Sequence, residues 1–242
     1  MNSPMNQSPL VNPTVLPLLP PCEVVTDKVL VVAPHPDDET LGCGGAIALL
    51  RCLNCKVQVL VISDGTLSHP RSRKYPAPAL RALRESETLA AMSLLGVEAS
   101  DVTFLGLPDG AIATQTSTQV KDALAKYRPN TIFLPLRYDP HPDHRATWQL
   151  IHSALVDLPL PRIIEYPIWD WDTKQRGNLP EPERVRAWRL DISQVVELKQ
   201  QAIAAYRSQT TDLIDDDPEG FRLTPEMLAN FTHPWEVYLE AQ

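Results

Sequence analysis

Two short stretches of the chain concentrate the side chains that could do chemistry. PHPDDE at residues 34–39 places an imidazole just before three adjacent carboxylates, and HPDH at residues 141–144 places two imidazoles around another carboxylate. Together they hold three of the six histidines. Grouping so many ionisable side chains at the edge of a core is costly unless something offsets their charge and desolvation. The two stretches therefore predict a site for a divalent metal.

The residue types within the two stretches suit a catalytic metal. His35, Asp38 and His144 supply two imidazoles and one carboxylate, a ligand set suited to Zn²⁺ with one position left open for water. Fe²⁺ can occupy a similar set. Such a metal lowers the pKa of bound water from about 15.7 toward about 7. Because adjacent residues project differently, Asp37 is free to act as the general base when Asp38 binds the metal.

The remaining groups of the second stretch complete a hydrolytic site. His141 can face the substrate, where it protonates the leaving group or stabilises an oxyanion, and Asp143 can hold its imidazolium in place. Metal, base, acid and orienting carboxylate together are what hydrolysis of an amide requires. The alternative, in which Asp37 or Asp38 only caps a helix, does not explain two His-Pro-Asp clusters.

Both clusters follow a predicted strand. The apolar runs and helical spacings predict strands at 28–33, 56–62, 102–105, 131–136 and 162–166, alternating with helices at 40–51, 80–95, 118–127 and 146–156. This alternation predicts an α/β fold, a Rossmann-like three-layer α/β/α sandwich with a mostly parallel sheet. Ligands bind at the carboxyl ends of strands in such a sheet, so two loops distant in sequence can meet there.

The two ends of the chain are predicted differently. Residues 1–26 are rich in Pro, Asn and Ser and are expected to form an extended arm, followed by a single domain over 27–242. In the last third we expect one long helix over 192–207, a solvated acidic loop over 212–219 and a short helix from Pro225.

Composition limits which classes of partner are expected for this protein and in which compartment it is expected. A formal net charge of −8, from 30 acidic and 22 basic residues, argues against nucleic acid as the main partner. No apolar run approaches the roughly 18 residues that span a bilayer, and we expect a cytoplasmic protein. The four cysteines are too few and unevenly placed for a disulfide framework. Oligomeric state is left open, a homo-oligomer included.

Three further patterns have both a structural and a functional interpretation. Gly42-Cys43-Gly44-Gly45 lacks the third glycine of a dinucleotide loop, so close packing of a helix on the sheet is favoured. Trp169 and Trp171 could stack on a sugar, although packing is favoured for them as well. The basic residues of 71–81 and the acidic run 215–217 are interpreted as solvated.

The paired clusters resemble those of the PIG-L/LmbE family of zinc-dependent deacetylases, which remove the acetyl group from N-acetylglucosamine-containing substrates. The similarity extends through RESE at 84–87, FLGLPDG at 104–110 and residues 199–209, although the first motif begins with Pro34 where Ala is usual. The resemblance implies these roles: zinc ligands His35, Asp38 and His144; general base Asp37; acid or oxyanion stabiliser His141 with its partner Asp143; substrate-contacting positions Arg84 and Asp109.

We therefore expect a metal-dependent N-deacetylase, with Zn²⁺ or Fe²⁺ as cofactor, that acts on a small-molecule or glycolipid amino-sugar conjugate. Three alternatives stay open on the sequence: a hydrolase of another amide, ester or phosphoester, a nucleotide-dependent Rossmann enzyme, and a non-catalytic sugar-binding relative. The lone three-ligand set argues against a two-metal phosphatase, which needs more bridging carboxylates.

Overall fold

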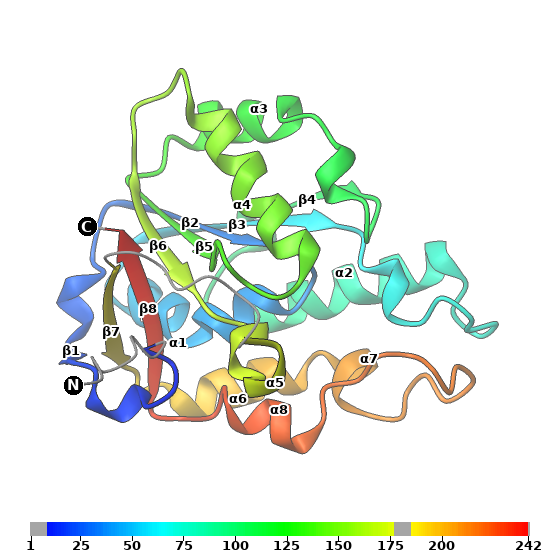
Figure 1. The fold of residues 1–242 in the computed structure, drawn as a ribbon. Coiled ribbons are helices and arrows are strands. Elements are labelled where there is room, and N and C mark those ends of the chain that lie inside the picture. The colour runs from blue at the N-terminus through cyan, green and yellow to red at the C-terminus, as the bar shows by residue number, and fades with distance from the viewer. Residues whose placement is uncertain (1–8, 177–184, 242) are drawn as a thin grey trace, which may run out of the picture.

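The computed structural model describes residues 9–176 and 185–241, and these residues form one eight-stranded sheet in the order β1-β7-β8-β6-β5-β2-β3-β4 (Figure 1). The strands are Leu18–Leu19 (β1), Lys28–Ala33 (β2), Lys56–Ser63 (β3), Val102–Leu107 (β4), Thr131–Pro135 (β5), Arg162–Tyr166 (β6), Val185–Asp191 (β7) and Trp235–Ala241 (β8). Strands β2 to β6 pair in parallel, whereas β8 is antiparallel to both β6 and β7. The predicted mostly parallel sheet is confirmed.

Helices cover both faces of this sheet. They are Asp38–Cys52 (α1), Ala77–Leu94 (α2), Thr118–Tyr127 (α3), Pro142–Leu155 (α4), Thr173–Arg176 (α5), Val196–Ala204 (α6), Arg207–Thr210 (α7) and Pro225–Ala229 (α8). In Figure 1, α3 and α4 lie on one side of the sheet and α1, α2 and α6 on the other. The three-layer α/β/α prediction is confirmed.

The alternation of side chains along β2 builds two separate cores. Val29 and Val31 pack with α1, α2 and α6, whereas Leu30 and Val32 pack with α3 and α4. Because successive side chains of a strand point to opposite faces, a strand buried on both faces has a continuous apolar run. That run is what made β2 predictable.

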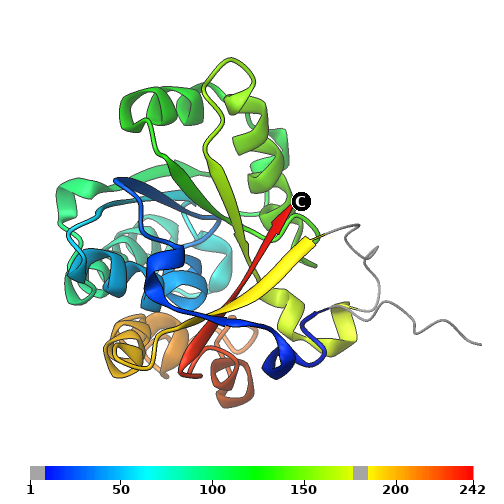
Figure 2. The same cartoon turned by 90° about the vertical axis from the view of Figure 1, so that its left-hand side faces the viewer.

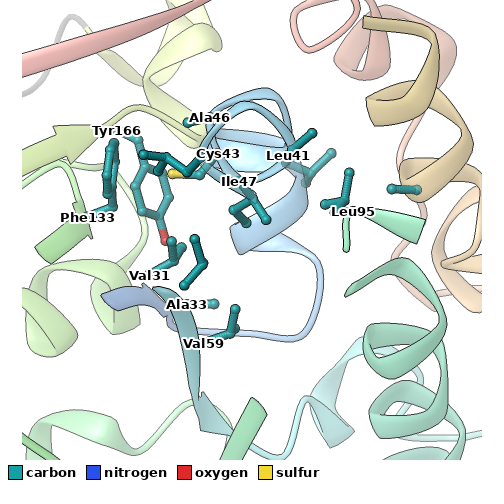
Figure 3. Packing of buried hydrophobic residues seen from close by; sticks show 14 of the residues in the cluster. Val31, Ala33, Leu41, Cys43, Ala46, Ile47, Val59, Leu95, Phe133 and Tyr166 are labelled. Atoms are coloured by element: carbon teal, nitrogen blue, oxygen red, sulfur yellow. The ribbon is translucent and has the colours of Figure 1, made fainter. Parts of the chain in front are cut away.

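Helix α1 packs close to the sheet, with Cys43 and Ile47 between the helix and the strand residues Val31 and Tyr166 (Figure 3). Its glycines permit this close approach. A Cβ at Gly42 would lie 2.3 Å from Cδ2 of Tyr166, and one at Gly45 would lie 2.6 Å from Cδ1 of Ile192. Real Cβ atoms do not approach that closely, so the backbone reaches the sheet only because these residues have no side chain. The packing interpretation of this glycine cluster is confirmed.

The prediction of one long helix over 192–207 is wrong. Helix α6 covers only Val196–Ala204, and two strands beside it, β7 and β8, were missed. Ile192 lies in the turn between β7 and α6, where it fills the space over Gly45. The backbone leaves the helical conformation at Tyr206, between α6 and α7, and the hydroxyl of this residue donates to Glu39. The short helix from Pro225 is confirmed as α8.

The described part of the N-terminal arm lies against the domain. Strand β1 pairs in parallel with β7, Leu18 with Arg189 and Leu19 with Leu190, along the edge of the sheet (Figure 2). Leu10 is buried against the sheet, and the Arg189 guanidinium donates to the carbonyl of Leu16. Among the described residues, no helix combines the length and the apolar character that crossing a bilayer requires.

Candidate active site

The two clusters meet at the carboxyl ends of β2 and β5, which are neighbours in the sheet. Strand β2 ends at Ala33, and α1 begins four residues after Pro34, at Asp38. The second cluster was predicted as a loop, but α4 begins within it. Pro142 is the first helical residue, a position where the fixed φ of proline is favourable and its missing N–H is not needed. Helix α4 thereby carries Asp143 and His144 in its first turn.

Three imidazoles converge at this point. The ring of His35 lies 4.9 Å from that of His141 and 5.4 Å from that of His144, and the last two are 5.0 Å apart. One nitrogen of each ring lies within 4.8 Å of the others. Oδ2 of Asp38 is 3.3 Å from His35 Nδ1 and 3.2 Å from His144 Nε2. The structure therefore brings the three expected ligands together, with His141 beside them.

This arrangement fits a metal. Two donor atoms bound to one tetrahedral zinc at about 2.0–2.1 Å lie about 3.3 Å apart, close to the separations of Asp38 Oδ2 from both imidazoles. Both ring nitrogens of His144 are buried, and each faces a carboxylate without the alignment of a hydrogen bond, Nε2 at 3.2 Å from Asp38 and Nδ1 at 3.3 Å from Asp139. A metal at Nε2 would be shared with Asp38 Oδ2, while Asp139 holds the ring at its other nitrogen.

Asp139, which the sequence analysis missed, supports His144 from behind. Its carboxylate is fully buried and lies 3.3 Å from His144 Nδ1. It also accepts the backbone N–H groups of His141, at 2.8 Å, and Trp169, at 3.1 Å. A carboxylate on the far nitrogen of a ligand histidine fixes the ring's tautomer and orientation. The available signal was an aspartate two residues before the HPDH cluster.

His35 has carboxylates on its other nitrogen. Nε2 lies 3.2 Å from Oδ1 of Asp109 and 3.3 Å from Oδ2 of Asp143. Asp109 accepts the N–H of Leu67, and Asp143 accepts that of Gly110, which holds both carboxylates in place. Asp109 was expected to contact substrate and the Asp143 carboxylate to hold His141. In the structure both lie against His35.

His141 is oriented by backbone instead. Its Nδ1 accepts the N–H of Asp143 at 3.2 Å, so a neutral ring carries its proton on Nε2. Burial and the nearby His144 and His35 lower the pKa of His141 to about 4, which keeps the ring neutral. Burial also lowers the pKa of His144, but Asp139 and Asp38 raise it more, to about 10.

Asp37, the expected general base, is held by groups on three elements. Its φ of 127° lies in a region that side-chain-bearing residues rarely adopt. Nη2 of Arg84 donates to its carboxylate at 3.0 Å, and Glu39 accepts its backbone N–H at 3.1 Å. Tyr206 in turn donates to Glu39. Burial, together with Asp38 and Glu39, raises the pKa of Asp37 to about 8 against the lowering effect of Arg84.

Arg84 is buried, and its guanidinium donates hydrogen bonds to other groups of the protein. Besides Asp37, its guanidinium donates to the carbonyls of Pro36 and Gly65. The contact with substrate that was expected of Arg84 stays a prediction, whereas its contacts in the structure position the base.

The site opens into a cavity of about 690 Å³. The ionisable part of its lining, here called the floor, consists of His35, Asp37, Asp38, Arg84, Asp109 and His141. An apolar wall is formed by Trp169, Phe221, Leu223, Met227 and Phe231. Cavities of about 300–1,000 Å³ hold drug-sized ligands, so this one accommodates more than an acetyl group.

The acidic run 215–217 was interpreted as solvated, and this is wrong for two of its residues. The Asp216 carboxylate accepts the N–H groups of Arg73 and Lys74 and the hydroxyl of Ser72. Asp217 is buried and accepts the N–H of Arg71. The run therefore binds the loop 71–74 and fixes the chain that leads into the apolar wall.

Comparison with known sequences identifies the family. The profile of the PIG-L family, described as GlcNAc-PI de-N-acetylase, matches residues 30–155, which is more than half of the chain and includes both clusters. The chain belongs to the PIG-L family. The prediction drawn from the paired motifs is confirmed.

Relatives of this PIG-L chain are deacetylases of amino sugars. A probable N-acetyl-α-D-glucosaminyl L-malate deacetylase 2 of Bacillus subtilis is 28% identical over 88% of this chain and 96% of its own. The diacetylchitobiose deacetylase of Thermococcus kodakarensis is 26% identical over 75% and 70%. The solved N,N'-diacetylchitobiose deacetylase of Pyrococcus horikoshii has a TM-score of 0.58 at 28% identity over 80% and 74%.

The range matched by the PIG-L profile includes only part of the residues that line the cavity. The floor residues from His35 to His141 lie within the matched range 30–155, whereas Trp169 and the wall residues from 221 to 231 lie beyond it. The floor is thus the part shared with the family profile. The apolar wall is built by segments that the profile does not describe.

Proposed function

We propose that this chain is a metal-dependent N-deacetylase that hydrolyses the acetamide of an N-acetylglucosamine-type conjugate to acetate and a free amine. The observation that carries the proposal is the cluster of His35 Nδ1, Asp38 Oδ2 and His144 Nε2, with separations of 3.2 and 3.3 Å, beside Asp37. The amino-sugar substrates named for the relatives support the substrate class.

His35, Asp38 and His144 are proposed to hold the metal. Their nitrogen and oxygen donors suit Zn²⁺, and Fe²⁺ fits the same set. When bound, the metal polarises the acetamide carbonyl and lowers the pKa of water.

The residues of the chain then divide the reaction between them. Asp37 takes a proton from the attacking water, whose oxygen adds to the carbonyl carbon. Nε2–H of His141 donates a hydrogen bond to the carbonyl oxygen as negative charge develops there. The C–N bond breaks, the proton taken by Asp37 passes to the amine nitrogen, and the acetic acid formed loses its remaining proton to solvent and leaves as acetate. Arg84 and Glu39 hold Asp37 in place for the first step.

Acetate release from a panel of N-acetylglucosamine conjugates tests this function, with the metal content measured on the same samples. Asp37→Asn is expected to keep the metal while turnover falls by at least about 10²–10⁴-fold, the usual contribution of a general base. His144→Ala is expected to lose the metal. Asp157→Asn, at an exposed aspartate paired with Lys121, is the control. Full turnover in Asp37→Asn, or full metal content in His144→Ala, would contradict the assignment.

A further inference from the structure

The apolar wall begins at the floor of the cavity. The ring of Trp169 stacks on that of His141, with centroids 5.9 Å apart and planes 25° apart. Phe221 follows, its ring 5.5 Å from that of Trp169. A sugar whose acetamide reaches His141 therefore has an aromatic surface directly beside it. A group attached to that sugar can extend along this surface toward Leu223 and Met227, which also line the cavity.

The wall is preformed. Leu223 and Phe231 are buried members of the main core cluster, and Trp169, Phe221 and Met227 pack against that cluster. Phe221 donates its N–H to the carbonyl of Ser68, next to the loop that the acidic run 215–217 binds. A preformed apolar surface binds an apolar ligand without a prior cost of ordering its side chains.

The charges around the cavity are unsuited to an anion. Among the described lining residues, Arg84 is the single Lys or Arg, and its two Nη atoms donate to Asp37, Pro36 and Gly65 while its Nε is buried. Glu226 adds a carboxylate on the side of the wall. Anionic groups bind in proteins through charge-assisted bonds from Arg or Lys. A carboxylate or phosphate on the conjugate finds no such partner here.

We propose that the conjugate's aglycone is uncharged and apolar, an aryl or alkyl group that lies against Trp169 and Phe221. This inference rests on the proposed deacetylase function and names its substrate class. The proposed aglycone differs from malate, a dianion, which is part of the name of one relative. The wall residues that would select it lie outside the range matched by the family profile.

The test compares three N-acetylglucosamine conjugates with the metal-loaded protein, namely the phenyl, methyl and L-malate glycosides, each as the same anomer. We expect kcat/KM for the phenyl conjugate to exceed that for the methyl conjugate by about tenfold or more, mainly through KM, because apolar pockets discriminate by this order for small groups. The malate conjugate is expected to be the poorest. Equal values for phenyl and methyl, or a preference for malate, would overturn the inference.

Variants of residues in the wall test which side chains cause the preference for the phenyl conjugate. Phe221→Ala is expected to reduce the phenyl-to-methyl ratio at least severalfold, with Phe221→Leu as a milder substitution if the first variant is unstable. Glu226→Lys is expected to raise kcat/KM for the malate conjugate severalfold, because it places a cation beside the wall. Leu160→Ala, at a side chain 85% exposed and outside the cavity lining, is the control that leaves all three values unchanged. Unchanged ratios in both Phe221 variants would place the aglycone elsewhere.

Calorimetry separates this inference from the function on which it rests. The Asp37→Asn protein is titrated with the phenyl and methyl conjugates, so that binding is measured without turnover. If no conjugate releases acetate, the proposed function fails, and the two binding constants then decide the inference. At least about tenfold tighter binding of the phenyl conjugate supports it, and equal binding overturns it.

Discussion

Replacing Asp139 by Asn should weaken metal binding although Asp139 is not itself an expected ligand. In the structure its carboxylate contacts the Nδ1 atom of His144 at 3.3 Å, accepts the N–H groups of His141 and Trp169, and is hydrogen-bonded to the carboxyl of Asp170. The substitution keeps the shape but removes the negative charge. It also puts an NH₂ group where one oxygen accepted hydrogen bonds, so at least one of these partners loses its acceptor.

The size of the effect follows from these contacts. Loss of a carboxylate behind a ligand histidine typically costs about 10–100-fold in metal affinity, or about 1.4–2.8 kcal/mol. A buried donor left without an acceptor costs about 1–3 kcal/mol of folding stability. Both effects are expected in Asp139→Asn, since the residue is fully buried.

Competition with a fluorescent zinc chelator measures the affinity, and chemical denaturation of the metal-free protein measures the stability. Asp157→Asn again serves as the control, because that carboxylate is exposed and forms an ion pair with the exposed Lys121. A metal affinity in Asp139→Asn within twofold of the unsubstituted protein, alongside a loss of stability, would show a purely structural role. The argument that Asp139 orients His144 would then be refuted.

Three further results are expected. Removing the metal with a chelator should abolish acetate release and lower the melting temperature, and added Zn²⁺ should restore both. A ligand that binds only the folded state stabilises it by about 2.7 kcal/mol at a concentration 100 times its Kd. A melting temperature that does not change with the metal would contradict this. Burial and the adjacent Asp139 raise the pKa of Asp170 to about 8, as burial does for Asp37. The folded protein then binds protons at these carboxyls that the unfolded chain has released, so stability falls as pH rises from about 4 to about 8. Asp170→Asn should reduce that slope, leaving the part due to Asp37, in denaturation curves of the metal-free protein recorded across the window, and an unaltered slope would show that Asp170 does not contribute. Gly42→Ala should destabilise the fold by about 1–3 kcal/mol through overpacking against Tyr166, as measured by denaturant unfolding, and an unchanged midpoint would mean that α1 shifts without cost.

Much of the fold could be predicted because its central strands are buried on both faces. Strands β2 and β6 and helix α3 have the expected bounds. An apolar run marks β2, β-branched and aromatic residues mark β6 despite Arg162 and Glu165, and a clear helical period marks α3. Strand β7 was missed because it has charged residues at 186, 189 and 191 and is covered by neighbours only in part. Its partners, β1 and β8, come from the two ends of the chain, so no local sequence pattern indicates that these strands pair.

The candidate site shows the same division. The sequence contains the two His-Pro-Asp clusters, and their positions after predicted strands were enough to expect that they meet. The role of Asp139 could not be read from the sequence, because it depends on which nitrogen of His144 faces away from Asp38. The contacts of Asp109 and Asp143 with His35 depend likewise on the turn after β4 and the start of α4.

The sequence by itself therefore determined the chemistry and the class of fold, because residue types and local periodicity are properties of short segments. Only the tertiary structure decided how the ionisable groups pair and what surrounds the substrate. Trp169, Phe221 and Phe231 are separated by up to 62 residues along the chain, yet all three line one cavity. They do so because β8 runs antiparallel to its neighbours β6 and β7, so the segment that leads into β8 lies at the carboxyl ends of the other strands, at the mouth of the site.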